Sequence, residues 1–167
     1  MTEIDMVLGI VEQAIKIEKF GYEFYDSMRS FVKDSKGQRF ISYLAKLEVD
    51  HIKWLEEEYE RQLAKLQELH ENREVDISLL AKQEIFLGDP KLPEVFKDFD
   101  PKSALNYGIE IEKRSVAFYE KNMDLGDDDN LRELFRKLAD FEKDHITILK
   151  NNLKSLETKG SWELPQK

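Results

Sequence analysis

The stretch LAKLEVDHI at residues 44–52 decides the fold of this chain, because it recurs 94 residues later as LADFEKDHI at residues 138–146. The same offset, without a gap, aligns IKIEK at residues 15–19 with IEIEK at residues 109–113. Two segments that recur in one order and at one spacing indicate two copies of a single structural unit. The sequence therefore predicts an internal duplication, with a first and a second segment in each copy.

Each of these segments has the pattern of an amphipathic helix. Apolar residues recur every three or four positions, strand-like alternation is absent, and the chain has only seven glycines and four prolines. A long crossover at about residues 72–100, with one short apolar helical stretch near residues 77–86, interrupts the pattern. The predicted fold is an all-α four-helix bundle of two repeated helical hairpins, forming one domain over residues 1–167. Its four long helices are predicted at about residues 3–30, 36–71, 101–123 and 130–157.

Polar residues mark where these helices begin. Ser35, followed by Gln38, fits a capping box for the second helix. Asp100 before Pro101 fits an N-cap with proline at the first helical position. Asp129 is predicted to begin the fourth helix, 94 residues after Ser35. We interpret the acidic run that ends at Asp129 as a turn and helix cap, with a cation entry site as the alternative.

Composition excludes several classes of function. The chain has no cysteine, which rules out disulfides, thiolate zinc sites, cysteine-ligated iron–sulfur clusters and a catalytic thiol. Its formal net charge of -9 disfavours nucleic acid and anionic membranes, both of which attract basic surfaces. No apolar run is long enough to cross a bilayer, and the N-terminus lacks the basic start of a secretory signal. We therefore expect a cytoplasmic protein whose metals, if any, are bound by oxygen and nitrogen atoms.

Four glutamates occupy equivalent heights in the two predicted hairpins. Glu18 lies 30 residues before Glu48, and Glu112 lies 30 residues before Glu142. The midpoint of each pair falls in a predicted turn, and residues equidistant from the turn of an antiparallel hairpin lie at one level. That level is ~20 Å from the turn, since a helix rises about 1.5 Å per residue. The four carboxylates are therefore predicted to meet in the middle of the bundle.

A histidine follows two of these glutamates at helical spacing. His51 and His145 come three residues after Glu48 and Glu142, which places carboxylate and imidazole on one helical face. Four carboxylates and two imidazoles match the ligand set of di-iron and di-manganese bundles. Without cations, four converging glutamates would repel each other and lose their hydration, so a metal-free core of this kind is unfavourable. The alternative is that these are surface residues of a glutamate-rich chain, but two Glu-x-x-His motifs at one repeat offset favour the metal site.

On these residues the chain resembles the rubrerythrin-like branch of the ferritin-like superfamily of di-iron carboxylate proteins. The resemblance is carried by residues 14–18 with Phe24-Tyr25, by the stretch ending at Glu112 with Phe118-Tyr119, and by both Glu-x-x-His motifs. It implies a ferritin-like four-helix fold that binds two iron ions and reacts with hydrogen peroxide or dioxygen. A manganese or mixed pair would suit the same ligands.

The resemblance also implies a role for each ligand. It implies bridging carboxylates at Glu48 and Glu142, terminal carboxylates at Glu18 and Glu112, and one nitrogen ligand per metal from His51 and His145. Tyr25 and Tyr119, seven residues after the terminal glutamates, share the ligand face. Contact with the ligand carboxylates and ordinary core packing both remain open for these two tyrosines.

Two departures from the family pattern bear on the reaction. Rubrerythrins typically carry a rubredoxin module with four cysteine ligands, so this cysteine-free chain needs a separate electron-donor protein such as a rubredoxin. Full rubrerythrins also place a carboxylate three residues after the third-helix glutamate, where this chain has Ser115.

The expected function is an oxidoreductase with an external electron donor. A ferroxidase or iron-handling protein and a structural bundle with incidental metal are the alternatives. We further expect a homodimer or a higher homo-oligomer, because the outer half of the second helix and the crossover offer surface for packing.

Overall fold

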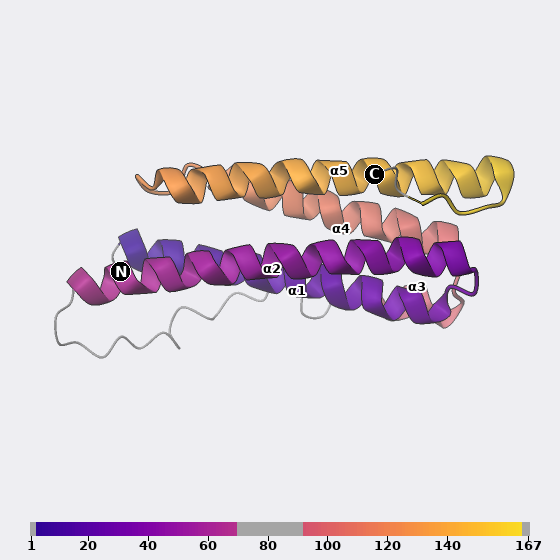
Figure 1. The fold of residues 1–167 in the computed structure, drawn as a ribbon, viewed down its shortest axis with the longest axis horizontal. Coiled ribbons are helices and arrows are strands. Elements are labelled where there is room, and N and C mark those ends of the chain that lie inside the picture. The colour runs from indigo at the N-terminus through magenta and orange to yellow at the C-terminus, as the bar shows by residue number, and fades with distance from the viewer. Residues whose placement is uncertain (1–2, 70–91, 165–167) are drawn as a thin grey trace.

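Two long helical hairpins lie side by side in the computed structural model, which describes residues 3–69 and 92–164 (Figure 1). The first hairpin consists of α1 (Glu3–Phe31) and α2 (Ser35–Leu69), and the second of α4 (Pro101–Asn122) and α5 (Asp129–Lys159). A short helix, α3 (Leu92–Lys97), precedes α4. The predicted all-α fold of two helical hairpins is confirmed. None of the helices in the described part of the chain is long and apolar enough to cross a membrane.

The two hairpins pack together through equivalent helices, the first helix of one against the first of the other and the second against the second. Besides the contacts within each hairpin, α1 packs against α4 and α2 packs against α5. The buried apolar residues form two clusters, one towards each end of the bundle. The first cluster contains Phe24, Met28, Phe40, Leu44, Leu105 and Leu149, and the second contains Val11, Leu55, Tyr119, Leu131, Phe135 and Leu138. On all four long helices, buried polar residues lie between the segments that form these clusters.

The caps of α2 and α5 lie one residue before the predicted positions. The Asp34 carboxylate accepts hydrogen bonds from the backbone N–H groups of Lys36 (2.8 Å) and Gly37 (2.9 Å). Asp128 caps α5 in the same way, through the N–H groups of two following residues. The assignments to Ser35 and Asp129 were therefore wrong by one residue, because an aspartate caps well and its charge also suits the positive end of a helix. Asp34 and Asp128 are themselves 94 residues apart, so the cap belongs to the repeat.

Two other predicted features of the helix starts have different outcomes. The side chain of Gln38 does not complete a capping box but donates a hydrogen bond to the Val32 carbonyl at 2.9 Å. The start at Asp100 and Pro101 is confirmed, since the Asp100 carboxylate accepts from the Ser103 N–H at 2.8 Å. The end of α5 lies two residues beyond the predicted position, where Gly160 adopts the left-handed conformation.

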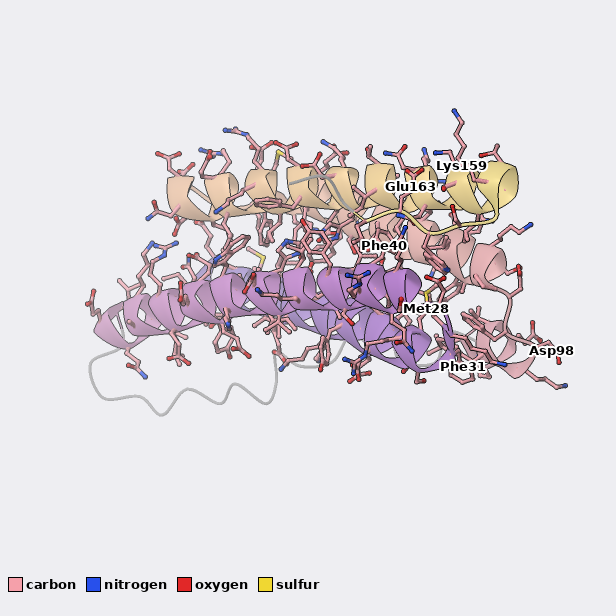
Figure 2. The ribbon with its side chains drawn as sticks, turned by 45° about the vertical axis from the view of Figure 1, so that its right-hand side comes forward. Met28, Phe31, Phe40, Asp98, Lys159 and Glu163 are labelled. Carbon is pink, nitrogen blue, oxygen red and sulfur yellow. The ribbon has the colours of Figure 1, made fainter. Side chains whose placement is uncertain are left out.

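The crossover is only partly within the described residues. The predicted helical stretch at residues 77–86 and the predicted end of the second helix at residue 71 lie outside them. Residues 92–97 lie in the predicted crossover, outside the helical stretch predicted for it, yet they form α3. Pro93 falls in the first turn of α3 and costs no hydrogen bond there. Phe96 stacks on Phe31 with ring centroids 5.1 Å apart, at the end of the bundle where Phe31 and Asp98 are labelled in Figure 2.

The C-terminal segment closes this end of the bundle. After Gly160 the chain turns back along α5, and the Asn152 side chain donates to the Glu163 carbonyl (3.0 Å) and accepts from the Glu163 N–H (2.9 Å). Trp162 is thereby buried against Phe40, which is labelled with Glu163 in Figure 2. Gly37 leaves the space that this ring needs, because a Cβ there would lie 2.7 Å from the Trp162 ring.

Candidate metal centre

All six predicted ligand residues meet between the two apolar clusters. None of the six residues is more than 2% exposed. They reach this position because the ligand face of each helix is continuous with its apolar face. α1 supplies Glu18, α2 supplies Glu48 and His51, α4 supplies Glu112, and α5 supplies Glu142 and His145.

The six residues form two overlapping groups, each with ligand atoms within 4.8 Å of one another. Glu48 and Glu142 belong to both groups. Glu18 and His51 complete the first group, and Glu112 and His145 complete the second. Each group offers three carboxylates and one imidazole, so the arrangement can hold two cations that share two carboxylates. Their role as metal ligands remains a prediction.

The imidazole nitrogens Nδ1 face the carboxylates. His51 Nδ1 lies 3.0 Å from Glu142 Oε1 and 3.1 Å from Glu18 Oε2. His145 Nδ1 lies 2.9 Å from Glu142 Oε2 and 3.6 Å from Glu112 Oε1. The two histidine rings stack with centroids 5.3 Å apart and planes 13° apart. One Nδ1 atom from each hairpin is therefore directed at the space that the carboxylates enclose.

Several of these buried atoms lack a hydrogen-bond partner, which tests whether a metal fits. Within the described residues they are one oxygen of Glu48, both oxygens of Glu142 and both ring nitrogens of His145. The Glu142 oxygens and His145 Nδ1 lie within ion-pair distance of neighbouring site residues but make no hydrogen bond. Buried polar atoms are nearly always paired in folded proteins, so unpaired ones at a single place call for a missing partner. Oxygen and imidazole donors are the ligands that ferrous iron and manganese bind. The residues present therefore fit a pair of divalent cations.

Electrostatics supports the same conclusion. Burial raises the pKa of Glu18 and of Glu112, and the charges of Glu142 and Glu48 raise both further. Burial alone would lower the pKa of His51, but contacts with Glu142, Glu18 and Glu48 raise it to about 12. In the absence of metal, protons on carboxyls and imidazoles must therefore offset the clustered negative charge. Two divalent cations supply the same positive charge without those protons.

Burial also opposes ionisation of the two shared glutamates, yet the histidines outweigh it. Contacts with His145 and His51 hold the pKa of Glu48 and of Glu142 below the usual range of a glutamate. The two carboxylates common to both groups are thus the ones that stay ionised. An ionised carboxylate is the form that can bind a metal through both oxygens.

The two tyrosines link the hairpins through the site. Tyr25 of α1 donates a hydrogen bond to Glu112 of α4, and Tyr119 of α4 donates one to Glu18 of α1. Both tyrosines are fully buried and also pack in the apolar clusters, so both interpretations left open by the sequence apply. Burial raises the pKa of each phenol, and the neighbouring carboxylate raises it further, which keeps the phenols neutral donors.

Gly21 of α1 lies directly against the shared Glu48, a feature that the sequence prediction missed. A Cβ at Gly21 would lie 3.3 Å from Cδ and from Oε1 of Glu48. The 94-residue offset pairs Gly21 with Ser115, which is buried and donates its hydroxyl to the Ile111 carbonyl at 3.3 Å. A glycine inside a helix costs about 0.5–1 kcal/mol, so its position three residues after Glu18 was the available signal. Neither position supplies a further carboxylate.

Three other acidic residues near the candidate ligands in the sequence, Glu110, Asp50 and Asp144, point to the outside of the bundle. Glu110 is exposed and pairs with Lys113 at 2.7 Å, which agrees with the choice of Glu112 as the α4 ligand. Asp50 pairs with Lys53 at 3.8 Å. Asp144 is exposed, and His70 lies outside the described residues.

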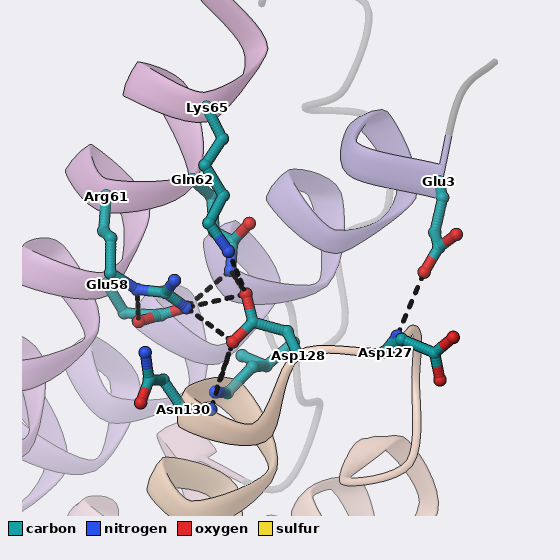
Figure 3. Close-up of polar contacts among 9 residues, drawn as sticks. Glu3, Glu58, Arg61, Gln62, Lys65, Asp127, Asp128 and Asn130 are labelled. Carbon is teal, nitrogen blue, oxygen red and sulfur yellow. Dashed lines mark hydrogen bonds and ion pairs between the residues drawn. The ribbon is translucent and has the colours of Figure 1, made fainter.

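The acidic run near the start of α5 belongs to a network of ion pairs. The Asp128 carboxylate accepts from Arg61 (2.8 Å), Lys65 (2.6 Å) and Gln62 (2.7 Å) of α2 (Figure 3). Glu58 completes the network by pairing with Arg61. These contacts occupy Asp128, which supports the interpretation as a helix cap over a cation entry site. The α2 partners of Asp128 could not be predicted from the repeat, because they lie outside the repeated segments.

Comparison with known proteins agrees with this architecture. A sequence model of the family described as Rubrerythrin matches residues 9–153. The solved structure of a hypothetical protein from Pyrococcus furiosus is similar, with a TM-score of 0.64 and 21% sequence identity over 93% of this chain and 91% of that chain. At this identity the likeness to the solved structure shows the fold alone. Among curated proteins, no match was found.

Proposed function

Because the chain belongs to the rubrerythrin family, a family of di-iron carboxylate proteins, we propose that it is an oxidoreductase that reacts with hydrogen peroxide or dioxygen. The observation that carries this proposal is the buried cluster of four glutamates and two histidines, in which several side-chain oxygen and nitrogen atoms make no hydrogen bond. A separate electron-donor protein, such as a rubredoxin, re-reduces the centre, since the chain has no cysteine for a built-in module.

The proposal assigns each residue a task. Glu18 and His51 would hold one ion, Glu112 and His145 would hold the other, and Glu48 and Glu142, common to both groups, would serve both. The bound pair supplies two one-electron redox equivalents, which hard carboxylate ligands favour by stabilising ferric iron. Iron is inferred from the family, and a manganese or mixed pair is compatible with the same donors.

The protein prepares the site for these ions in three ways. Both imidazoles must lose a proton before Nδ1 can bind a metal. The four carboxylates then balance the positive charge of the bound ions. Tyr25 and Tyr119 hold the two terminal carboxylates in place by donating hydrogen bonds. The apolar clusters on either side keep water away from the ligands.

Metal analysis followed by single-turnover kinetics tests the proposal. We expect the protein to take up two ferrous ions per chain, one for each ligand group. Peroxide should oxidise the loaded protein rapidly, and a supplied reductant should allow repeated turnover. A protein that takes up clearly less than one transition metal per chain would be a structural bundle, and the proposal would be wrong.

Ser115 favours a second candidate, a ferroxidase or iron-handling protein. Ser115 lies three residues after Glu112, and its hydroxyl donates a hydrogen bond to the Ile111 carbonyl of the same helix. Among the described residues, this position therefore supplies no seventh protein ligand. The same kinetic experiment separates the two candidates. Accumulation of many iron atoms per chain after oxidation would indicate iron handling, whereas oxidation that stops at the loaded pair and resumes with reductant would indicate the oxidoreductase.

A further inference from the structure

Aromatic rings connect one side of the candidate centre to the surface between α2 and α5. The buried ring of His51 lies 5.5 Å from Trp54 and 5.6 Å from Phe141, centroid to centroid. Trp54 and Phe141 are 5.5 Å apart and half-buried. The ammonium group of Lys137 lies 4.1 Å from the centroid of the Trp54 ring, a cation–π contact that holds the ring in place.

The internal repeat shows that this cluster is not a general packing requirement. The 94-residue offset pairs Trp54 with Ile148 and Phe141 with Leu47, so the equivalent positions beside His145 are aliphatic. The six candidate ligands and the two buried tyrosines, by contrast, are the same residue types in both halves. Since aliphatic side chains satisfy the packing at one half of the bundle, the aromatic pair at the other half calls for a further explanation.

The rings also form a continuous series that leads into the site. From Trp54 and Phe141 the series passes to His51, which stacks on His145. His51 belongs to the first ligand group and His145 to the second, so the series reaches both. Aromatic π systems couple electronically far better than saturated side chains, and here they span the distance from half-exposed residues to both nitrogen ligands.

We propose that Trp54 and Phe141 form the path by which electrons from an external one-electron donor enter the metal centre. This inference rests on the proposed oxidoreductase function. In each step the donor loses one electron and one ferric ion becomes ferrous, while no bond forms or breaks at either ring. The path enters on the His51 side, next to the ligand group that would hold an ion through Glu18 and His51.

A plug that merely excludes water is the competing explanation, and it predicts the opposite kinetic effect. Replacing a plug with a smaller aliphatic residue admits small reductants and speeds reduction of the centre. Replacing a conducting ring with an aliphatic one slows reduction. The sign of the change therefore decides between the two explanations.

The test compares Trp54→Leu and Phe141→Leu with Trp54→Phe, which keeps an aromatic ring, and with Ile148→Leu at the repeat-equivalent position. Each protein is loaded with ferrous iron, its metal content is measured, and it is oxidised with peroxide. The ferric protein is then mixed with reduced methyl viologen or with reduced rubredoxin, and the loss of ferric absorbance is followed. We expect several-fold slower reduction in both leucine variants, and rates close to the unmodified protein in Trp54→Phe and Ile148→Leu.

A second readout does not depend on turnover. In a Trp162→Phe background, Trp54 is the only tryptophan, and cobalt(II) bound at the centre should quench its fluorescence until the site is saturated. If Trp54→Leu binds the normal amount of iron and its ferric centre is reduced at the same rate or faster, the proposed electron path is wrong, but the proposed function is not. Failure of the unmodified protein to load iron, or to form a ferric centre, would overturn the proposed function and the path together.

Discussion

At the scale of single residues, the two glutamates shared by both ligand groups decide whether a metal pair can form. Glu142→Gln keeps the size of the side chain but removes the charge and one acceptor oxygen, so it cannot bind two ions. We expect the iron content after ferrous loading to fall from two ions per chain to at most one. Atomic absorption after gel filtration measures this. Glu110→Gln, at an exposed glutamate of α4, is the matched control, and unchanged stoichiometry in Glu142→Gln would contradict the shared assignment.

The tyrosines lead to a second prediction at this scale. Tyr25→Phe leaves Glu112 buried without its phenol donor, which should lower the free energy of unfolding of the metal-free protein by about 1–3 kcal/mol. Loss of a hydrogen bond to a metal ligand should also weaken metal binding by about 10–100-fold. Urea unfolding and metal titration measure the two effects. Tyr43→Phe, at an exposed tyrosine, should change the unfolding free energy by less than about 0.5 kcal/mol.

At the scale of helices, the Asp128 network ties the start of α5 to α2. Burial opposes ionisation of Asp128, but bonds from Lys65, Gln62 and Arg61 hold its pKa well below the usual range. A depressed pKa in the folded state adds stability above the unfolded-state pKa of about 4, and this stability is lost as the pH falls. Asn is as good an N-cap as Asp, so Asp128→Asn removes the charge while it keeps the cap.

This substitution gives the third prediction. Asp128→Asn should lower the free energy of unfolding by about 1–3 kcal/mol at pH 7, because the cationic side chains of Arg61 and Lys65 lose the charge of their partly buried partner. The difference from the unmodified protein should shrink below about pH 4, where the unfolded chain is protonated. Urea unfolding at several pH values measures it. Asp124→Asn, on a carboxylate that is 80% exposed, should show little effect at any pH. If the stability difference between Asp128→Asn and the unmodified protein does not change with pH, the charge explanation is wrong.

The helices also show what periodicity can and cannot predict. The bounds of α1, α4 and α5 were predicted to within two residues, since the apolar spacing stops where packing stops. α3 was missed because six residues are too few to show a period and Pro93 suggested a break. The caps were displaced by one residue because Asp34 and Ser35 are both good caps, and only the backbone geometry distinguishes them.

At the scale of the whole molecule, the repeat predicted which residues share a level but not how the two halves face each other. Equal distances from the turns placed the four glutamates together, and the structure brings them together. The crossed bonds from each tyrosine to the opposite hairpin depend on the rotation of α1 against α4, which no spacing within one hairpin reports. The aromatic pair at Trp54 and Phe141 was likewise hidden, because it departs from the repeat that revealed the ligands.

The metal centre should also stabilise the whole bundle, because all four long helices contribute to it. Metal-free protein must bury clustered carboxylates and imidazoles with only protons to offset their charge, whereas bound cations favour the folded state by mass action. A ligand at 100 times its dissociation constant adds about 2.7 kcal/mol of stability per site, so chelation should lower the thermal midpoint by several degrees. Ferrous or manganous ions, added back under anaerobic conditions, should restore it. The double variant Glu48→Gln, Glu142→Gln should show no such dependence on metal, since it loses the carboxylates on which both ions rely. Equal midpoints for metal-free and loaded unmodified protein would mean that the six side chains meet for a reason other than metal binding.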